Sequence, residues 1–134
     1  MSVVADTHAL HWFLTGAEQL SARAREALEA AEADLAGGIY VSVASRLDLH
    51  YLVAARCMDR TLAARLWSVV YDSDLNIHPL PITAEIVERF GDAALAPLRD
   101  PWDRLIVATT LVLGIPLVSA DRVIARVAGV DVVW

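Results

Sequence analysis

The sequence predicts an α/β fold in which a mainly parallel sheet is covered by helices on both faces. Short apolar runs rich in valine and isoleucine alternate along the chain with longer segments of helical character. This alternation is typical of parallel strands joined by crossover helices. Hydrophobic residues make up 57% of the 134 residues, against ~45–50% in an average globular domain. The excess indicates elements buried on both sides, or an apolar surface kept for a partner.

The first half of the chain is expected to contain two strands and four helices. Ser21 is a suitable N-cap for a long helix, and Gly37-Gly38 would stop that helix near Leu35. Ser45 is expected to open another helix. The expected strands cover residues 3–5 and 39–41, and the expected helices cover residues 7–14, 21–35, 45–56 and 60–71.

The second half continues the alternation. Pro79 interrupts the run 77–80, so this segment is expected to be an edge strand or a loop. Thr83 can cap a helix that runs to about Leu95, and Asp100-Pro101 is a favourable start for a helix that ends at Gly114. Residues 117–119 and 130–133 are the last expected strands. No repeat or long linker divides the chain, so residues 1–134 are expected to form a single domain.

The charge balance argues at first against a nucleic-acid ligand. The net charge is −6, whereas a protein that binds nucleic acid by charge alone would be basic. The eleven basic residues are all arginines, which pair with phosphate through two parallel hydrogen bonds. A pocket full of carboxylates would itself make the total negative. Net charge therefore lowers the expectation of a nucleic-acid substrate without excluding one.

The residues that usually mark export are missing from the sequence. Cys57 is the only cysteine, so no intrachain disulfide can form. The N-terminus has no basic region and no long apolar run, and no stretch approaches the ~18 apolar residues needed to cross a membrane. We expect a cytoplasmic protein that does not enter a membrane.

Four aspartates are expected to meet at one edge of the sheet. Asp6 and Asp121 follow predicted strands, and Asp48 and Asp103 lie one turn inside helices that would start at the same edge. Ligands of parallel α/β sheets bind in the crevice at this edge. Four converging carboxylates would repel one another unless a cation neutralised them, and oxygen ligands suit Mg²⁺ or Mn²⁺ better than zinc. Such an ion can activate a water for attack on a phosphate ester.

Each of these acids also has a purely structural interpretation. Asp48 and Asp103 stand three residues after Ser45 and Asp100, so both can take part in capping their helices. Asp6 and Asp121 can cap the helices that follow them. Asp100 is a good N-cap before a proline, and we assign it a structural role.

Three segments of the chain resemble a known family. Residues 6–12, Asp-Thr-His-Ala-Leu-His-Trp, resemble the N-terminal signature of PIN domains of the VapC toxin group. Residues 100–108 are similar to the third motif of this group, and residues 117–121 to the fourth. The three segments occur in the order of the family and span nearly the whole chain.

The resemblance implies a PIN-like three-layer α/β/α domain that acts as a metal-dependent endoribonuclease. It implies Mg²⁺ or Mn²⁺ as the cofactor, RNA as the substrate, a cognate VapB-like antitoxin as the inhibitor, and a homodimer. Carried over to this sequence, the metal ligands are Asp6, Asp103 and Asp121. Ser119 would support the site through its hydroxyl, and Thr7 by hydrogen bonding near the same edge.

The second motif departs from the family pattern. Residues 41–48 match a segment in which the family usually has glutamate at the last position, but here that position is Asp48. Aspartate keeps the charge and is one methylene shorter. Asp48 therefore joins the catalytic candidates, with the expectation that it reaches the ion through a water or leaves the site weaker.

Arg104 and two histidines are further candidates. Arg104 can bind a substrate phosphate, hold the neighbouring carboxylates, or form a structural ion pair. His8 and His11 are three residues apart on a predicted helix. A zinc site would need more histidine or cysteine ligands, so packing roles are favoured for both.

Two other functions fit parts of the pattern. A scaffold protein with little catalysis would keep the fold, and the shorter acid at Asp48 is its best support. A phosphoryl-transfer protein with a nucleophilic aspartate would normally use a lysine to steady the phosphoryl group. The sequence contains no lysine, so this alternative ranks last.

Overall fold

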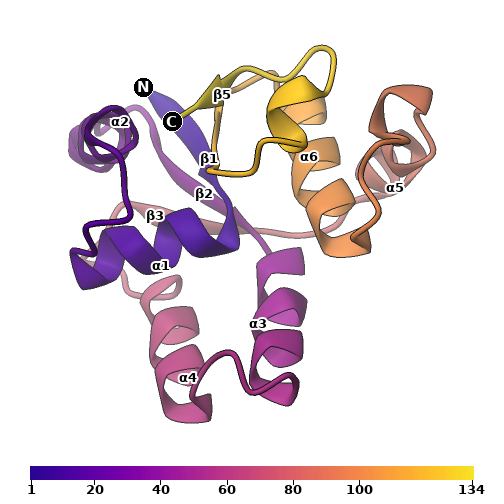
Figure 1. Ribbon diagram of the computed structural model, residues 1–134. Helices are drawn as coiled ribbons and strands as arrows, with labels where there is room; N and C mark the ends of the chain where they lie inside the picture. The colour runs from indigo at the N-terminus through magenta and orange to yellow at the C-terminus, as the bar shows by residue number, and fades with distance from the viewer.

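Five short strands form one parallel sheet in the computed structural model, which describes residues 1–134. The strands are β1 (Ser2–Ala5), β2 (Gly38–Ser42), β3 (Ile77–Leu80), β4 (Leu117–Val118) and β5 (Val132–Val133). Their order is β3-β2-β1-β4-β5, and every neighbouring pair is parallel (Figure 1). The α/β class and the parallel sheet are thus confirmed. The strand with Pro79 pairs with β2 alone and is an edge strand, as its sequence predicted.

Helices cover both faces of this sheet. The helices are α1 (Thr7–Thr15), α2 (Ala22–Ala33), α3 (Ala44–Ala54), α4 (Arg60–Val69), α5 (Ala84–Phe90) and α6 (Pro101–Leu113), with 3₁₀ turns at Ala93–Leu95 and Ile124–Arg126. In Figure 1, α2 lies on one side of the sheet, α5 and α6 lie on the other, and α3 and α4 extend side by side beyond the carboxyl ends of β1 and β2. None of the six helices has both the length and the hydrophobicity needed to span a membrane.

Three helices differ from the sequence-based prediction. Helix α3 begins at Ala44 and not at Ser45, because β2 runs almost directly into it and the hydroxyl of Ser42 accepts a hydrogen bond from the amide of Ala44. Helix α5 ends at Phe90 and not near residue 95, because Gly91 ends it and the side chain of Asp92 opens a separate 3₁₀ turn.

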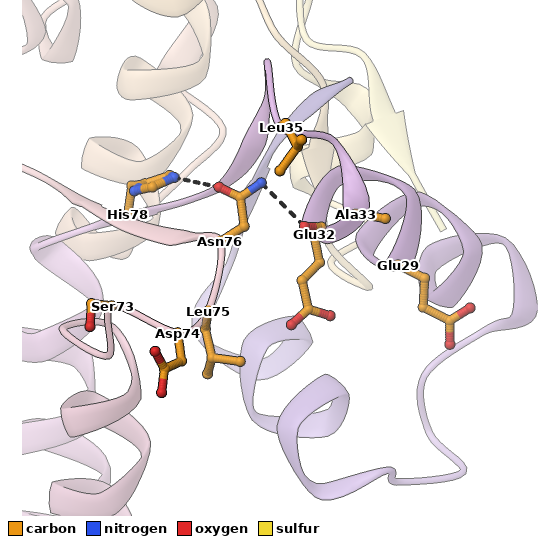
Figure 2. A pocket seen from close by; sticks show the side chains of 9 residues that line it. All are labelled: Glu29, Glu32, Ala33, Leu35, Ser73, Asp74, Leu75, Asn76 and His78. Atoms are coloured by element: carbon orange, nitrogen blue, oxygen red, sulfur yellow. Dashed lines mark hydrogen bonds between the residues drawn. The ribbon is translucent and has the colours of Figure 1, made fainter.

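Helix α2 ends at Ala33, before the expected Gly37-Gly38 stop. The reason is a side chain from a distant part of the chain. The amide of Asn76 donates hydrogen bonds to the carbonyls of Ala31, Glu32 and Asp34, and these are groups that a helix end leaves without partners. Figure 2 shows the bond to Glu32.

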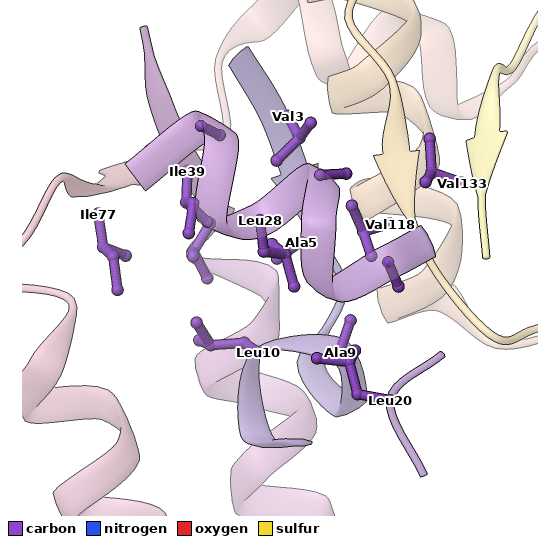
Figure 3. Packing of buried hydrophobic residues seen from close by; sticks show 14 of the residues in the cluster. Val3, Ala5, Ala9, Leu10, Leu20, Leu28, Ile39, Ile77, Val118 and Val133 are labelled. Atoms are coloured by element: carbon purple, nitrogen blue, oxygen red, sulfur yellow. The ribbon is translucent and has the colours of Figure 1, made fainter. Parts of the chain in front are cut away.

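The two faces of the sheet pack against separate hydrophobic cores. Successive side chains of a strand point to opposite faces, so Val3 and Ala5 of β1 lie in one core and Val4 lies in the other. Figure 3 shows the first core, where Leu28 of α2 packs over the strand residues. The second core is filled largely by α6, and a small third cluster joins α3 to α4. Together these layers form the three-layer α/β/α arrangement that was predicted.

Candidate active site

The carboxyl ends of the strands open into an acidic pocket of about 450 Å³. This pocket contains all four aspartates that the sequence singled out, and Asp100 is a fifth. The lining residues are Asp6, Thr7, His8, Trp12, Asp48, Leu52, Asp100, Asp103, Ala120 and Asp121. They come from the start of α1, from α3, from the start of α6 and from the loop after β4. The topology therefore brings together acids that are more than one hundred residues apart.

Two of these aspartates cap a turn and still keep an oxygen available. Asp6 is the N-cap of α1, and its Oδ1 accepts a hydrogen bond of 2.7 Å from the amide of Ala9. Oδ1 of Asp121 accepts from the amides of Val123 and Ile124 at 2.7 and 3.3 Å, while its Oδ2 accepts no hydrogen bond. The capping and ligand interpretations of these residues therefore do not exclude each other.

The start of α6 presents two acids with different tasks. Oδ1 of Asp100 accepts hydrogen bonds from the amides of Trp102 and Asp103, so Asp100 is the N-cap that its position before Pro101 predicted. The carboxylate of Asp103, in the first turn of α6, receives no hydrogen bond from the protein. Both of its oxygens are free to bind something in the pocket.

Among the acids of the pocket, Asp103 has a pKa that its surroundings raise to near neutrality. Burial raises its pKa to about 7, and the negative charges of Asp100, Asp48, Asp121 and Asp6 add to this effect in that order. Burial also raises the pKa of Asp6, opposed by hydrogen bonds from Ser119 and Ala9 and by the nearby His8. Repulsion of this kind is what a bound cation would relieve.

Two hydroxyl groups lie where the sequence placed them. Ser119 is buried; its hydroxyl accepts a hydrogen bond of 3.1 Å from the amide of Asp121 and lies near Asp6, whose pKa it lowers. It therefore connects two of the predicted ligands. Thr7 is also buried and lines the pocket, but its hydroxyl has no hydrogen-bond partner in the protein. An unpaired buried hydroxyl at this place is well suited to a bound water or phosphate oxygen.

Asp48 lies in the second turn of α3 and is half-buried in the pocket. It has no capping role, because α3 starts earlier than predicted and its first turn is served by Ser42. Its charge contributes to the raised pKa of Asp103. Asp48 therefore does not cap α3, and its side chain is still one methylene shorter than the glutamate of the family pattern.

Two predicted residues do not line the pocket: Ser119, which is buried, and Arg104. Arg104 is held elsewhere by other contacts. Its Nε donates a hydrogen bond of 2.6 Å to the carbonyl of Leu98, and its guanidinium lies over the ring of Phe90, 5.3 Å from the ring centre. These contacts tie the start of α6 to α5 and to the loop before it. Arg104 forms no ion pair.

The donor set of the pocket fits Mg²⁺ or Mn²⁺. No three histidine, cysteine, aspartate or glutamate side chains of the chain are placed so as to hold an ion directly. Mg²⁺ usually keeps several waters and takes only one or two protein carboxylates, so the spread of acids around this pocket suits it. Zinc would need three or four nitrogen or sulfur ligands, and His8 is the one such residue here.

Sequence reasoning missed Asp100 and His8 as pocket residues. Asp100 was assigned to capping alone, and it does cap α6 while also lining the pocket. His8 was assigned a packing role in preference to a zinc-ligand role, whereas its position beside Asp6 lowers the pKa of that carboxyl. For both residues the signal was adjacency to a predicted ligand at the edge of the sheet. A larger cavity, about 590 Å³ around Asn76 and His78, lies elsewhere (Figure 2).

Comparison with known proteins gives the family. The sequence matches the model of the PIN domain over residues 3–130. The chain belongs to the PIN-domain family. This confirms the resemblance of the sequence motifs to PIN domains. None of the curated proteins compared with this PIN domain matches it.

Solved structures share the fold of this PIN domain at low sequence identity. VapBC2 from Rickettsia felis, bound to a DNA fragment from its promoter, superposes with a TM-score of 0.71 at 13% identity, covering 98% of this chain and 97% of that one. VapC20 from Mycobacterium tuberculosis, a sarcin-ricin loop cleaving toxin, gives 0.69 at 17% identity, with 99% and 100% covered. DNA-bound VapBC from Salmonella typhimurium gives 0.66 at 17% identity, with 98% and 96% covered.

Proposed function

We propose that this PIN domain is a metal-dependent endoribonuclease and the toxin of a toxin–antitoxin pair. The observation that carries the proposal is the pocket in which burial and four surrounding aspartates raise the pKa of Asp103 to about 7. A cluster of repelling carboxylates in which Asp6 is buried and Asp103 half-buried is unfavourable for folding, so its presence at the ligand-binding edge of the sheet points to a cation that the reaction needs.

The chain's own residues supply binding and orientation. Asp6, Asp103 and Asp121 are the proposed ligands, one or two of them bound to the ion directly and the others through waters. When bound, Mg²⁺ or Mn²⁺ supplies a water of lowered pKa and a counter-charge for a phosphoryl oxygen. Ser119 holds Asp6 and Asp121 in place, and the positive N-terminal ends of α1 and α6 favour an anion in the pocket. Asp48 is proposed to orient a water from the opposite wall, and Thr7 to hydrogen bond to a water or phosphate oxygen.

The comparisons support the toxin assignment. Two of the similar structures are VapBC complexes bound to DNA, and the third is a toxin that cleaves the sarcin-ricin loop. By analogy, we propose a VapB-like antitoxin as the partner of this chain, RNA as its substrate, the cytoplasm as its location and a homodimer as its assembly. Light scattering tests the assembly, and a monomeric mass would contradict it.

The decisive variants are Asp6→Asn and Asp103→Asn, which keep the size of each side chain and remove its charge. We expect each to lower the rate of Mn²⁺-dependent RNA cleavage about 100-fold or more, because one ligand of the ion is lost. The assay measures cleavage of a labelled RNA after removal of metal by EDTA and again after addition of Mn²⁺. Asp74→Asn, in an exposed turn outside the acidic pocket, is the matched control. Full activity of both variants would overturn the mechanism.

A catalytically weak scaffold remains the second candidate. It is favoured by one observation, that no three side chains are placed to hold an ion directly. The same assay separates the two functions. A parent protein that does not cleave RNA at millimolar Mn²⁺ would support the scaffold.

A further inference from the structure

A cationic groove lies outside the acidic pocket, between α3 and α4. Its volume is about 530 Å³, and it is lined by Arg46, His50, Val53, Ala54, Arg56, Arg60, Ala63 and Ala64. Three of the chain's eleven arginines thus share one groove with a histidine, and no acidic residue lines it. The groove is therefore positively charged, although the protein as a whole has a net charge of −6.

The protein itself does not neutralise these arginines. The chain has two ion pairs, the N-terminus with Asp34 and Arg89 with Asp92, and both lie elsewhere. Arg46 is half-buried and, like Arg56 and Arg60, makes no side-chain hydrogen bond within the protein. Arg56 and Arg60 are exposed, and like charges that share a groove repel one another until an anion binds between them.

Two of the arginines occupy positions where local structure disfavours arginine. Arg56 follows the C-cap of α3 with a φ of 59°, and it is the only non-glycine residue of the chain with positive φ. Glycine is the usual residue at such a helix end, because a side chain strains the left-handed backbone. Arg60 is the first residue of α4, where the helix dipole disfavours positive charge. Unfavourable local choices that converge on one groove indicate a function for it.

The groove and the acidic pocket share helix α3. Asp48 and Leu52 of α3 line the acidic pocket, whereas Arg46 and His50 line the groove. Residues two apart on a helix point to nearly opposite sides, and a helix with its side chains is about 10–12 Å wide. A strand that leaves the acidic pocket therefore reaches the groove after crossing one helix.

We propose that this groove binds phosphate groups of the RNA strand next to the cleaved bond. The inference rests on the proposed function, and it explains how an acidic protein holds a polyanion near its carboxylates. Arginine forks match phosphate oxygens bidentately, and His50 adds a further donor. The shared helix favours RNA over an acidic protein segment, because it connects the groove to the site of cleavage.

The test measures RNA binding without cleavage. The parent and the double variant Arg46→Gln/Arg60→Gln are titrated into a fluorescein-labelled oligouridylate in EDTA at low salt, and anisotropy is recorded. We expect about a tenfold loss of affinity or more, with a salt dependence whose slope falls by about 1.4, or 0.7 for each lost phosphate contact. Arg23→Gln/Arg126→Gln removes the same charge from exposed positions outside both sites and should bind like the parent.

A further variant separates a functional arginine from a structural one. Arg56→Gly relieves the left-handed backbone, so it is expected to raise the thermal midpoint while lowering RNA affinity severalfold. A purely structural Arg56 would change stability alone, and that result would count against the proposal.

Three results would overturn the proposal. The first is equal RNA binding by the parent and the Arg46/Arg60 variant. The second is no RNA binding by the parent at low salt. The third is that the variant no longer binds a labelled polyglutamate peptide that the parent binds, while its RNA binding is unchanged. The last result would assign the groove to an acidic protein. Because EDTA prevents metal-dependent cleavage, a failure of the proposed nuclease activity leaves this binding result intact. Conversely, if the parent cleaves RNA and the Arg46/Arg60 variant binds RNA as well as the parent, only the proposed role of the groove is contradicted.

Discussion

Asp103 is the residue whose surroundings differ most from those of an ordinary surface carboxylate. It lies in the first turn of α6, whose N-cap is already provided by Asp100, so its own oxygens have no structural task. Burial and four neighbouring acids raise its pKa to about 7. Without a cation, the protein therefore folds with a carboxyl group that resists ionisation at neutral pH.

The pKa of Asp103 predicts how stability depends on pH. An unfolded aspartate titrates near 3.8, so between about pH 4 and 7 the folded protein keeps a proton that the unfolded chain has lost. Stability in EDTA should therefore fall as the pH rises through this window. Asp103→Asn removes this contribution and should raise the thermal midpoint by a few degrees above pH 7, with no gain near pH 4. A gain that is equal at both pH values would show that Asp103 is not the group responsible.

We propose that Asp48 determines how strongly the pocket binds its ion. It is half-buried on α3 with no capping task, so a longer side chain can extend further into the pocket. Asp48→Glu is expected to raise the rate of RNA cleavage at limiting Mn²⁺ by about tenfold, within the 10–100-fold range of changes around metal sites. Asp74→Glu is the control for the added methylene. An unchanged or lower rate would mean that the aspartate is already the better fit.

At the scale of elements, the start of α6 is held by Arg104. Its hydrogen bond to Leu98 and its stacking on Phe90 connect α6 to the preceding helix. Arg104→Gln is expected to lower the free energy of unfolding by about 1–3 kcal/mol and to leave RNA affinity unchanged. Urea denaturation and RNA anisotropy measure the two effects, and Arg99→Gln, an exposed neighbour, is the control. Loss of RNA affinity without loss of stability would restore Arg104 as a phosphate ligand.

The order of elements could be predicted from the sequence, because apolar periodicity and caps such as Asp100 and Gly114 are local signals. The end of α2 could not, since its cap is the side chain of Asn76, more than forty residues further along the chain. The early start of α3 was missed because its N-cap, Val43, has no capping side chain, and the hydroxyl that serves its first amide belongs to Ser42 of strand β2.

The acids of the site could be predicted from their places at strand ends and helix starts. Their double roles could not. One oxygen of Asp121 caps a turn while the other remains free, and only the folded structure distinguishes the two oxygens. Arg104 lies outside the pocket because it contacts Leu98 and Phe90, and no local sequence motif predicts these contacts.

At the scale of the whole molecule, an apolar core packs on each face of the sheet, and five aspartates lie together at the carboxyl ends of its strands. The acidic pocket opens on one side of α3 and the arginine groove lies on the other. The net charge of −6 alone does not reveal that acidic and basic residues occupy separate regions. A metal ion in the pocket would let both regions act on one phosphodiester strand.

The most direct test of the metal site is calorimetric titration of the metal-free protein with Mn²⁺ at pH 7. We expect the parent to bind Mn²⁺ and to release protons as it does so, because the carboxyl of Asp103, with a pKa of about 7, must ionise to bind the ion. Titrations in buffers of different ionisation enthalpy measure the protons released, and Asp103→Asn should release fewer and bind at least tenfold more weakly. The absence of any binding heat from the folded parent at millimolar Mn²⁺ would contradict the metal site.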